Sequence, residues 1–233
     1  MKRFVVVATA VALLVGGSSI AQAQVRPSRT PGPAFESAKQ ACEKAIDNRM
    51  ERLQTLRTLV SGSQHVTADH RTTLDTQMAN AEQGLAALKS KIDGDTDPAT
   101  LRTDCRSIVD DYRIYVLVSP KVREILVADW ESDIATRLDG IATRIQAAID
   151  KAKAKGKDET TAQTDLDQMK SKIADARAAI GGVASSVVNL QPSDWPGAHD
   201  TLATGRTSLR SGRDDLRGAR DAGWAAAQAL RQS

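Results

Sequence analysis

The sequence predicts an all-α protein, an antiparallel bundle of about six helices. Apolar residues recur at alternating spacings of three and four from Ala34 onward, as in Leu166, Met169 and Ile173. This is the period of an amphipathic helix. Proline-containing breaks separate the runs, and no run has the two-residue period of a strand. With 233 residues, of which 41% are hydrophobic and 3% aromatic, the chain can bury one large core or two small ones.

The first 23 residues are typical of a signal peptide. Lys2 and Arg3 precede an apolar run from Phe4 to Val15. The sequence Ala21-Gln22-Ala23 then has the pattern of a signal-peptidase site. Twelve apolar residues rise only about 18 Å as a helix, which is short of the roughly 30 Å hydrocarbon core of a membrane. We therefore expect cleavage after Ala23, no membrane span after cleavage, and a secreted, extracellular or cell-envelope protein.

The charge balance disfavours two kinds of partner. The whole chain has 32 Lys and Arg against 29 Asp and Glu, so loss of Lys2 and Arg3 leaves a net charge near +1. Positive and negative residues are interspersed rather than clustered. We therefore expect no nucleic acid partner and no binding to anionic membranes, because both depend on neutralising phosphates.

The helices follow a Pro-rich linker over residues 24–33. Asp97-Pro98 suits an N-cap and a first helical position, and Ser119-Pro120 offers the same pair. The apolar series continues through Ser119-Pro120, so the alternative is one long helix kinked at the proline. Gln191–Gly197 is a clear break. We predict helices over residues 34–61, 67–92, 98–118, 120–155, 159–188 and 197–231.

A weak internal similarity suggests two halves in tandem. Thr73–Met78 resembles Asp165–Met169, and Pro98 and Pro192 lie 94 residues apart. The similarity predicts one three-helix half over residues 34–118 and a second over residues 119–233, arranged as an elongated molecule. Alanine-rich amphipathic helices resemble one another by composition, so a true duplication and a chance likeness both stay open. One six-helix body and two bundles in line are likewise alternatives.

Cys42 and Cys105 are the two cysteines, and we predict a disulfide bond between them. An exported chain meets an oxidising environment, where an even pair usually closes a bridge. If the first three helices run up, down and up, the first and third are parallel, and each cysteine lies about two turns from the start of its helix. Closing this loop of about 64 residues contributes roughly 4 kcal/mol in the chain-entropy model.

The acidic turn before the third helix shares some features with a calcium-binding loop. Asp93, Asp95 and Asp97 alternate, and Asp104 stands at the twelfth position of such a loop. Pro98 occupies the sixth position, where the loop needs glycine for its sharp turn. We therefore interpret the segment as an acidic turn that caps the third helix, with no metal.

No pattern of catalytic residues stands out. His65, His70 and His199 are interpreted as solvated residues of turns or first helical turns, because no H-E-x-x-H or Cys/His cluster accompanies them. There is no G-x-S-x-G elbow and no phosphate-binding glycine loop. We predict that the protein is not an enzyme and has no catalytic residues, metal site or cofactor.

The last helix contains glycines at near-heptad spacing. Gly205, Gly212 and Gly223 fall in its apolar seam. Small residues in a seam let another helix approach closely, although each glycine costs up to about 1 kcal/mol of helix propensity. We predict close helix packing there rather than a ligand-binding loop.

The segment Tyr112–Trp130 is the candidate interaction site. Ile114–Val118 is apolar on every face, which indicates either burial between several helices or a surface that contacts a partner. Arg113, Lys121 and Arg123 would border such a surface. The predicted patch consists of Tyr112, Tyr115, Val118, Lys121 and Trp130.

The residues Cys42, Cys105, Tyr112–Val118 and Ser119-Pro120-Lys121 resemble those of a group of exported bacterial all-helical proteins that have no assigned biochemical function. The resemblance implies an exported helical fold and assigns no catalytic or binding residue. The tandem three-helix interpretation is also similar to spectrin-type architecture, which is a likeness of fold and carries no function.

The leading hypothesis is a secreted, non-enzymatic helical scaffold or interaction module. Its partner would be an unknown macromolecule, or a second copy associating through open coiled-coil seams. The alternative is an exported helical protein that binds a small ligand or a metal between helices near Tyr112, Tyr115 and Trp130. A third class is a hydrolase that uses carboxylates outside any known pattern.

Overall fold

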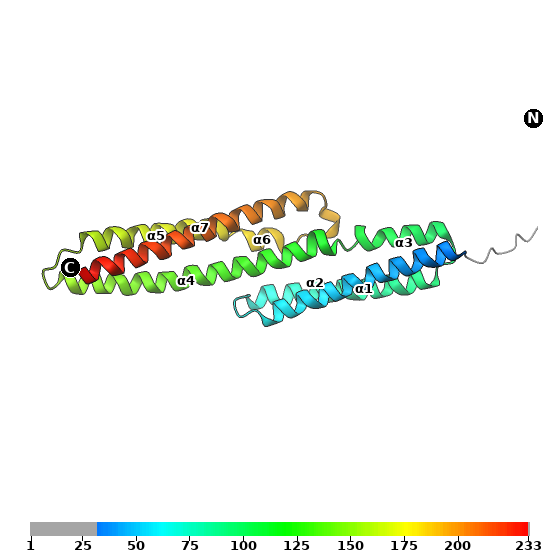
Figure 1. Cartoon of the computed structure of the whole chain (residues 1–233), viewed down its shortest axis with the longest axis horizontal. Coiled ribbons are helices and arrows are strands. Elements are labelled where there is room, and N and C mark those ends of the chain that lie inside the picture. Colours follow the sequence, from blue (N-terminus) through cyan, green and yellow to red (C-terminus); the bar gives the residue numbers. More distant parts are fainter. Residues whose placement is uncertain (1–31, 233) are drawn as a thin grey trace, which may run out of the picture.

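The computed structural model describes residues 32–232, and every regular element in that range is helical (Figure 1). The predicted all-α fold is therefore confirmed. The predicted signal peptide and nearly all of the linker lie outside the described residues. The elements are α1 (Pro33–Gly62), α2 (Ala68–Gly94), α3 (Pro98–Asp110), the π-helical turn η1 (Ile114–Val118), α4 (Ser119–Lys153), α5 (Thr160–Ile180), α6 (Val183–Val187), the 3-10 turn η2 (Pro192–Asp194) and α7 (Gly197–Gln232).

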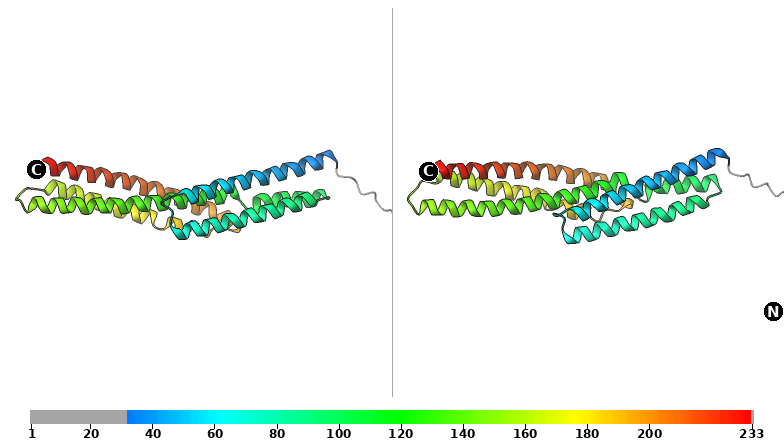
Figure 2. Two further views of the ribbon diagram at one scale, coloured as in Figure 1. Left: turned by 90° about the horizontal axis from the view of Figure 1, so that it is seen from below. Right: turned by 60° about the horizontal axis from the view of Figure 1, so that its bottom comes forward.

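The helices form two groups arranged along one axis. In one group α1, α2 and α3 run up, down and up, and in the other α4 and α7 run parallel while α5 packs beside them in the opposite direction (Figures 1 and 2). The start of α1 and the end of α7 lie at opposite ends of the elongated molecule (Figure 1). The tip of the α1–α2 hairpin overlaps the first part of α4 (Figure 2).

The described residues form two apolar cores, and the boundary between them lies within α4. The first core gathers residues from α1, α2, α3 and η1, extends along α4 as far as Val122 and Ile125, and includes Ala198 and Leu202 at the start of α7. The second begins at Ala128 and continues between α4, α5 and α7. The division therefore comes later than residue 119, and α4 takes part in both cores. The uninterrupted helix α7 also belongs to both cores, so α4 and α7 together connect the two groups.

The predicted third helix, 98–118, is wrong in its second part. It ends at Asp110, Arg113 adopts a left-handed conformation with φ of 43°, and a π-helical turn leads into α4. Ser119 is helical, so the predicted N-cap role is also wrong. The reason is Pro120, which has no amide hydrogen and whose ring crowds the carbonyl four residues back. The π turn relieves this crowding by bonding the amides of Val118 and Ser119 five residues back.

The predicted fifth helix, 159–188, is interrupted at Gly181 and Gly182. Two adjacent glycines lower helix propensity enough to end α5 at Ile180. A short helix, α6, then resumes at Val183. Val183 belongs to the second core and Val187 to the first, so this single helical turn joins them.

The predicted disulfide bond is present. Cys42 of α1 and Cys105 of α3 lie 5.6 Å apart between Cα atoms. The two helices run parallel, as the prediction required (Figure 1). The bond ties α1 to α3 beside the first core, where both cysteines are half-buried.

The predicted role of the glycines in α7 is confirmed. Gly205, Gly212 and Gly223 are buried. A Cβ atom on Gly212 would come within 2.5 Å of Ile180, and one on Gly223 within 2.6 Å of the Met169 sulfur. Hydrogen at these positions allows the close packing of α5 against α7, which is the most extensive helix pair among residues 32–232.

Candidate functional site

Two buried carboxylates occupy core-facing positions of α4. Glu124 and Glu131 are seven residues apart, and each is less than 5% exposed. Arg206 of α7 donates to Glu124 Oε1 across 3.2 Å, and Arg213 donates to Glu131 Oε1 across 3.0 Å. The arginines are also seven residues apart, so the two pairs form successive cross-links between parallel helices.

Each carboxylate is only partly compensated. The second oxygen, Oε2, of Glu124 and of Glu131 has no hydrogen-bond partner within the described part of the chain. Burial raises the pKa of Glu124 to about 7, and Arg206 offsets only part of this rise. Burial likewise raises the pKa of Glu131, against the opposing effect of Arg213. Glu124 can therefore gain or lose a proton near neutral pH.

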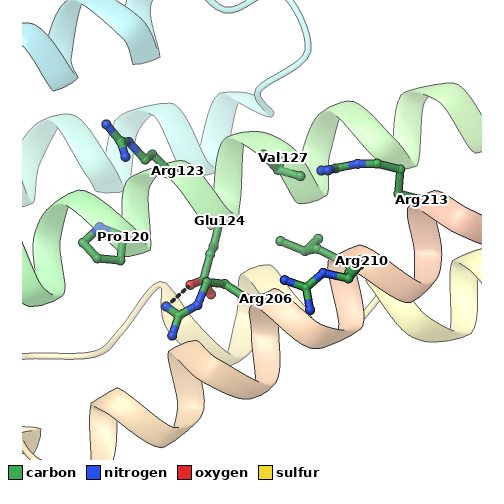
Figure 3. A pocket seen from close by; sticks show the side chains of 8 residues that line it. Pro120, Arg123, Glu124, Val127, Arg206, Arg210 and Arg213 are labelled. Atoms are coloured by element: carbon green, nitrogen blue, oxygen red, sulfur yellow. Dashed lines mark hydrogen bonds and ion pairs between the residues drawn. The ribbon is translucent and has the colours of Figure 1, made fainter.

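A pocket of about 390 Å³ lies between α4 and α7 beside Glu124 (Figure 3). Figure 3 shows Arg206 turned toward the Glu124 carboxylate, while Arg210 projects from α7 into the same space. Neither Arg123 nor Arg210 forms an ion pair with another described residue. The lining combines apolar and basic side chains: Pro120, Arg123, Glu124, Val127, Arg206, Leu209, Arg210 and Arg213.

The pocket opens at one end of a longer surface, which we call the arginine face. Basic and large apolar side chains recur on neighbouring edges of α4 and α7 at alternating spacings of three and four. Trp130 is 41% exposed and Trp224 63% exposed. The arginine face consists of Arg123, Val127, Trp130, Ile134, Arg137 and Ile141 on α4, and Arg206, Arg210, Arg213, Arg217, Arg220 and Trp224 on α7.

Some arginines of the face have acidic partners at the surface. Arg217 pairs with Asp214 at 3.1 Å, and Arg220 pairs with Asp221 at 2.7 Å. All four side chains are more than 60% exposed, and pairs of this kind contribute at most about 1 kcal/mol. An anionic partner could therefore take over these guanidinium groups at little cost.

The predicted interaction patch is not assembled at the surface. Lys121 is only 3% exposed, and its Nζ donates to Gln77 Oε1 at 2.6 Å and to the Leu190 carbonyl at 2.9 Å. Burial lowers the pKa of this amine to about 8. Val118 packs beside the first core. Placing Lys121 in a contact surface was therefore wrong, because the sequence did not reveal the acceptors that hold its amine inside.

The three aromatic residues of that patch have separate environments. Tyr112 is half-buried with its hydroxyl against Gly84, and burial raises its pKa. Tyr115 is exposed on η1, donates to the Asn48 carbonyl at 3.2 Å and stacks below Arg49. Trp130 belongs instead to the arginine face. Of the predicted patch, Tyr115 and Trp130 are the exposed members.

Two histidines are not the solvated residues that the sequence suggested. His65 pairs with Asp133 at 3.0 Å, and His70 pairs with Asp129 at 2.8 Å. Both aspartates lie one turn apart on α4. These contacts hold the tip of the α1–α2 hairpin on α4, and the half-buried histidines are part of that junction. His199, in contrast, is exposed and lies beside Asp200.

The acidic turn caps α3, as predicted. The Asp97 carboxylate accepts from the amides of Ala99 and Thr100. These bonds, that of Thr100 foremost, lower the pKa of Asp97. Asp104 receives a hydrogen bond from Lys91 at 2.7 Å. Between residues 32 and 232, no group of three or more His, Cys, Asp or Glu side chains is placed to hold a metal ion.

Sequence reasoning missed the arginine face and the buried glutamates. One signal was present, because the positions of Arg206, Arg210 and Arg213 keep the helical three-four rhythm on a face beside the glycine seam. The burial of Glu124 beside an arginine was not predictable locally, because its partner Arg206 lies 82 residues away in the chain.

No known protein family, curated protein or solved structure matches this chain. The resemblance to exported helical proteins remains a prediction. In the described range, no helix has the length and apolar character needed to cross a membrane.

Proposed function

We propose that this protein is an exported, non-enzymatic helical interaction module that contacts another macromolecule through the arginine face. The observation that carries the proposal is the alignment of exposed tryptophans and arginines along α4 and α7. Tryptophan and arginine are the residues most often responsible for binding energy in protein interfaces. Export is supported by the Cys42–Cys105 bond, which is typical of oxidising compartments.

The face suits an elongated acidic partner. From Arg206 to Trp224 the α7 edge extends about 27 Å at 1.5 Å per residue. Arginine forks match carboxylates in pairs, while Trp130 and Trp224 offer apolar area that is now in contact with water. An acidic amphipathic helix combines both requirements, because its carboxylates and apolar residues recur at the same three-four spacing.

Site-specific photo-crosslinking tests this function. A photoreactive residue is placed at Trp130, Arg217 or Trp224 of the oxidised mature protein and exposed to culture medium and cell-envelope fractions. As matched controls, the same residue replaces Ser171 or Ala178, which are exposed on α5. We expect one defined macromolecule to be captured from all three face positions and not from the controls. Equal labelling from α5, or no adduct from the face, contradicts the proposal.

A further inference from the structure

The pocket beside Glu124 has the composition of a small-molecule site. Its volume of about 390 Å³ falls within the range of pockets that take small ligands. Pro120, Val127 and Leu209 supply apolar walls. The side chains of Arg206 and Arg210, both on α7, extend into the space beside Glu124 (Figure 3). A ligand that fits this lining has an apolar body and at least one hydrogen-bond acceptor.

The charge of the lining selects an anion. Four arginines border the pocket, and Glu124 is the single acidic residue of the lining. Arg213 is occupied by Glu131 and Arg206 by Glu124, whereas Arg123 and Arg210 have no ion pair within the described residues. Two positive charges are therefore uncompensated even when Glu124 is ionised. Guanidinium groups bind carboxylates and phosphates in a two-pronged geometry.

Protonation of Glu124 would break its ion pair with Arg206. Its Oε2 atom has no hydrogen-bond donor and lies against Gly205, where a Cβ atom would come within 2.5 Å. The charged groups around it in the pocket lining are Arg123 of α4 and Arg206, Arg210 and Arg213 of α7. Helix α6, which contributes Val183 to the contact with Gly205, contains no charged residue. Burial raises the pKa of Glu124 to about 7. Once protonated, the carboxyl no longer competes for the Arg206 guanidinium.

We propose that this pocket binds a small amphipathic anion, a carboxylate or phosphate on an unbranched apolar chain. Arg206 and Arg210 hold the anionic group, and the chain packs against Pro120, Val127 and Leu209. Glu124 takes one proton from solvent as the anion binds, which leaves the Arg206 guanidinium to the ligand. This site goes beyond the proposed interaction with a macromolecule and does not depend on it.

Because Glu124 takes up one proton when the anion binds, the affinity for the anion depends on pH. Affinity is constant well below pH 7, where Glu124 already carries its proton in the free protein. Above pH 7 the free protein must first gain that proton, so the affinity falls by at most tenfold per pH unit. With a pKa of about 7, the dissociation constant of an anion that stays ionised rises about tenfold between pH 6 and pH 8.

Calorimetric titration of the oxidised mature protein tests the site with four probes. Octanoate carries both the head and the chain, octanol only the chain and acetate only the head, while octyl phosphate compares the two head groups at pH 8. We expect octanoate to bind with one-to-one stoichiometry and at least tenfold more tightly than octanol or acetate. Binding of octanol as tight as that of octanoate, or no saturable octanoate binding, overturns the proposal.

Three variants locate the site. Arg210→Ala is expected to weaken octanoate binding at least tenfold at both pH values, and Glu124→Gln to abolish the difference between pH 6 and pH 8. Arg217→Ala is the matched control, because it removes an exposed arginine one heptad further along and outside the pocket. Equal loss in Arg217→Ala, or an undiminished pH effect in Glu124→Gln, contradicts the inference.

Circular dichroism and melting of each variant establish that it is folded. Should Glu124→Gln fail to fold, the wild-type pH profile together with Arg210→Ala decides, since Arg210 is exposed and its loss opens no cavity. Failure of this site is distinguishable from failure of the interaction proposal, because the crosslinking positions Trp130, Arg217 and Trp224 lie outside the pocket lining.

Discussion

Three buried charged side chains of α4 differ in how completely hydrogen-bond partners compensate their burial. Lys121 finds two acceptors, whereas Glu124 and Glu131 each have one arginine and one uncompensated oxygen. A buried oxygen atom without a hydrogen-bond donor costs about 1–3 kcal/mol of folding stability. The unpartnered oxygens of Glu124 and Glu131 therefore reduce stability, and the proposed ligand site gives a role in binding to Glu124 alone.

Replacing Glu124 by Gln should change the pH dependence of stability. The unfolded carboxyl titrates near 4.5 and the folded one near 7, so between these values the folded state holds more protons and stability falls as pH rises. From pH 5 to pH 8 wild type should lose about 2 kcal/mol relative to Glu124→Gln. Urea denaturation at both pH values measures this difference.

Glu51→Gln serves as the control for this experiment, because Glu51 is an exposed glutamate of α1. Its stability should follow wild type at both pH values. Parallel curves for wild type and Glu124→Gln would show that the buried carboxyl does not titrate as described.

At the level of elements, glycines on one helix serve different purposes. Gly212 faces Ile180 of α5 at a distance that leaves no room for a methyl group. Gly218, further along α7, is half-buried, and an added Cβ would meet only the Lys172 side chain at 3.4 Å. The first position is set by packing, and the second carries only the cost of glycine in a helix.

Gly212→Ala and Gly218→Ala should therefore act in opposite directions. Gly212→Ala forces α5 and α7 apart and should destabilise the protein by about 1–3 kcal/mol. Gly218→Ala should stabilise it by up to about 1 kcal/mol through helix propensity. Chemical denaturation of both variants beside wild type measures the two effects. Destabilisation of equal size at both positions would refute the packing argument.

At the scale of the whole molecule, bonds between residues far apart in the sequence stabilise the first group of helices and attach it to α4. The Cys42–Cys105 bond closes a loop with a sequence separation of 63 in the first group. His65 and His70 attach the hairpin of that group to α4, which continues into the second core. Loss of the disulfide should therefore loosen α1 to α3 more than α5 and α7.

Reduction of the disulfide should lower the melting temperature while most helical circular dichroism remains at 25 °C. The chain-entropy model gives about 4 kcal/mol for a loop of this length. Hydrogen exchange should quicken in α1 and α3 and change little in α5. The Cys42→Ser/Cys105→Ser variant should have the melting temperature of the reduced protein, and added reductant should not change it. An unchanged melting temperature after complete reduction would contradict a stabilising bridge.

Features that depend on residues close together in the chain could be predicted before the fold was known. The three-four apolar rhythm defined α1, α2, α4 and α7, Asp97 was recognisable as a cap, and the glycine seam of α7 pointed to close packing. The disulfide followed from parallel helices in an up-down-up bundle. The break at Gly181-Gly182 was missed although its signal was local, because the apolar rhythm continued across it.

Which charged residues are buried and which surface is exposed depends on how the helices pack. Glu124 and Arg206 are 82 residues apart, and Lys121 and Gln77 are 44 residues apart. Side chains so distant in the chain meet through the packing of whole helices, and no short stretch of sequence records that packing. The arginine face, the pocket at its end and the histidine junction all arise from such meetings, which is why helical periodicity alone did not reveal them.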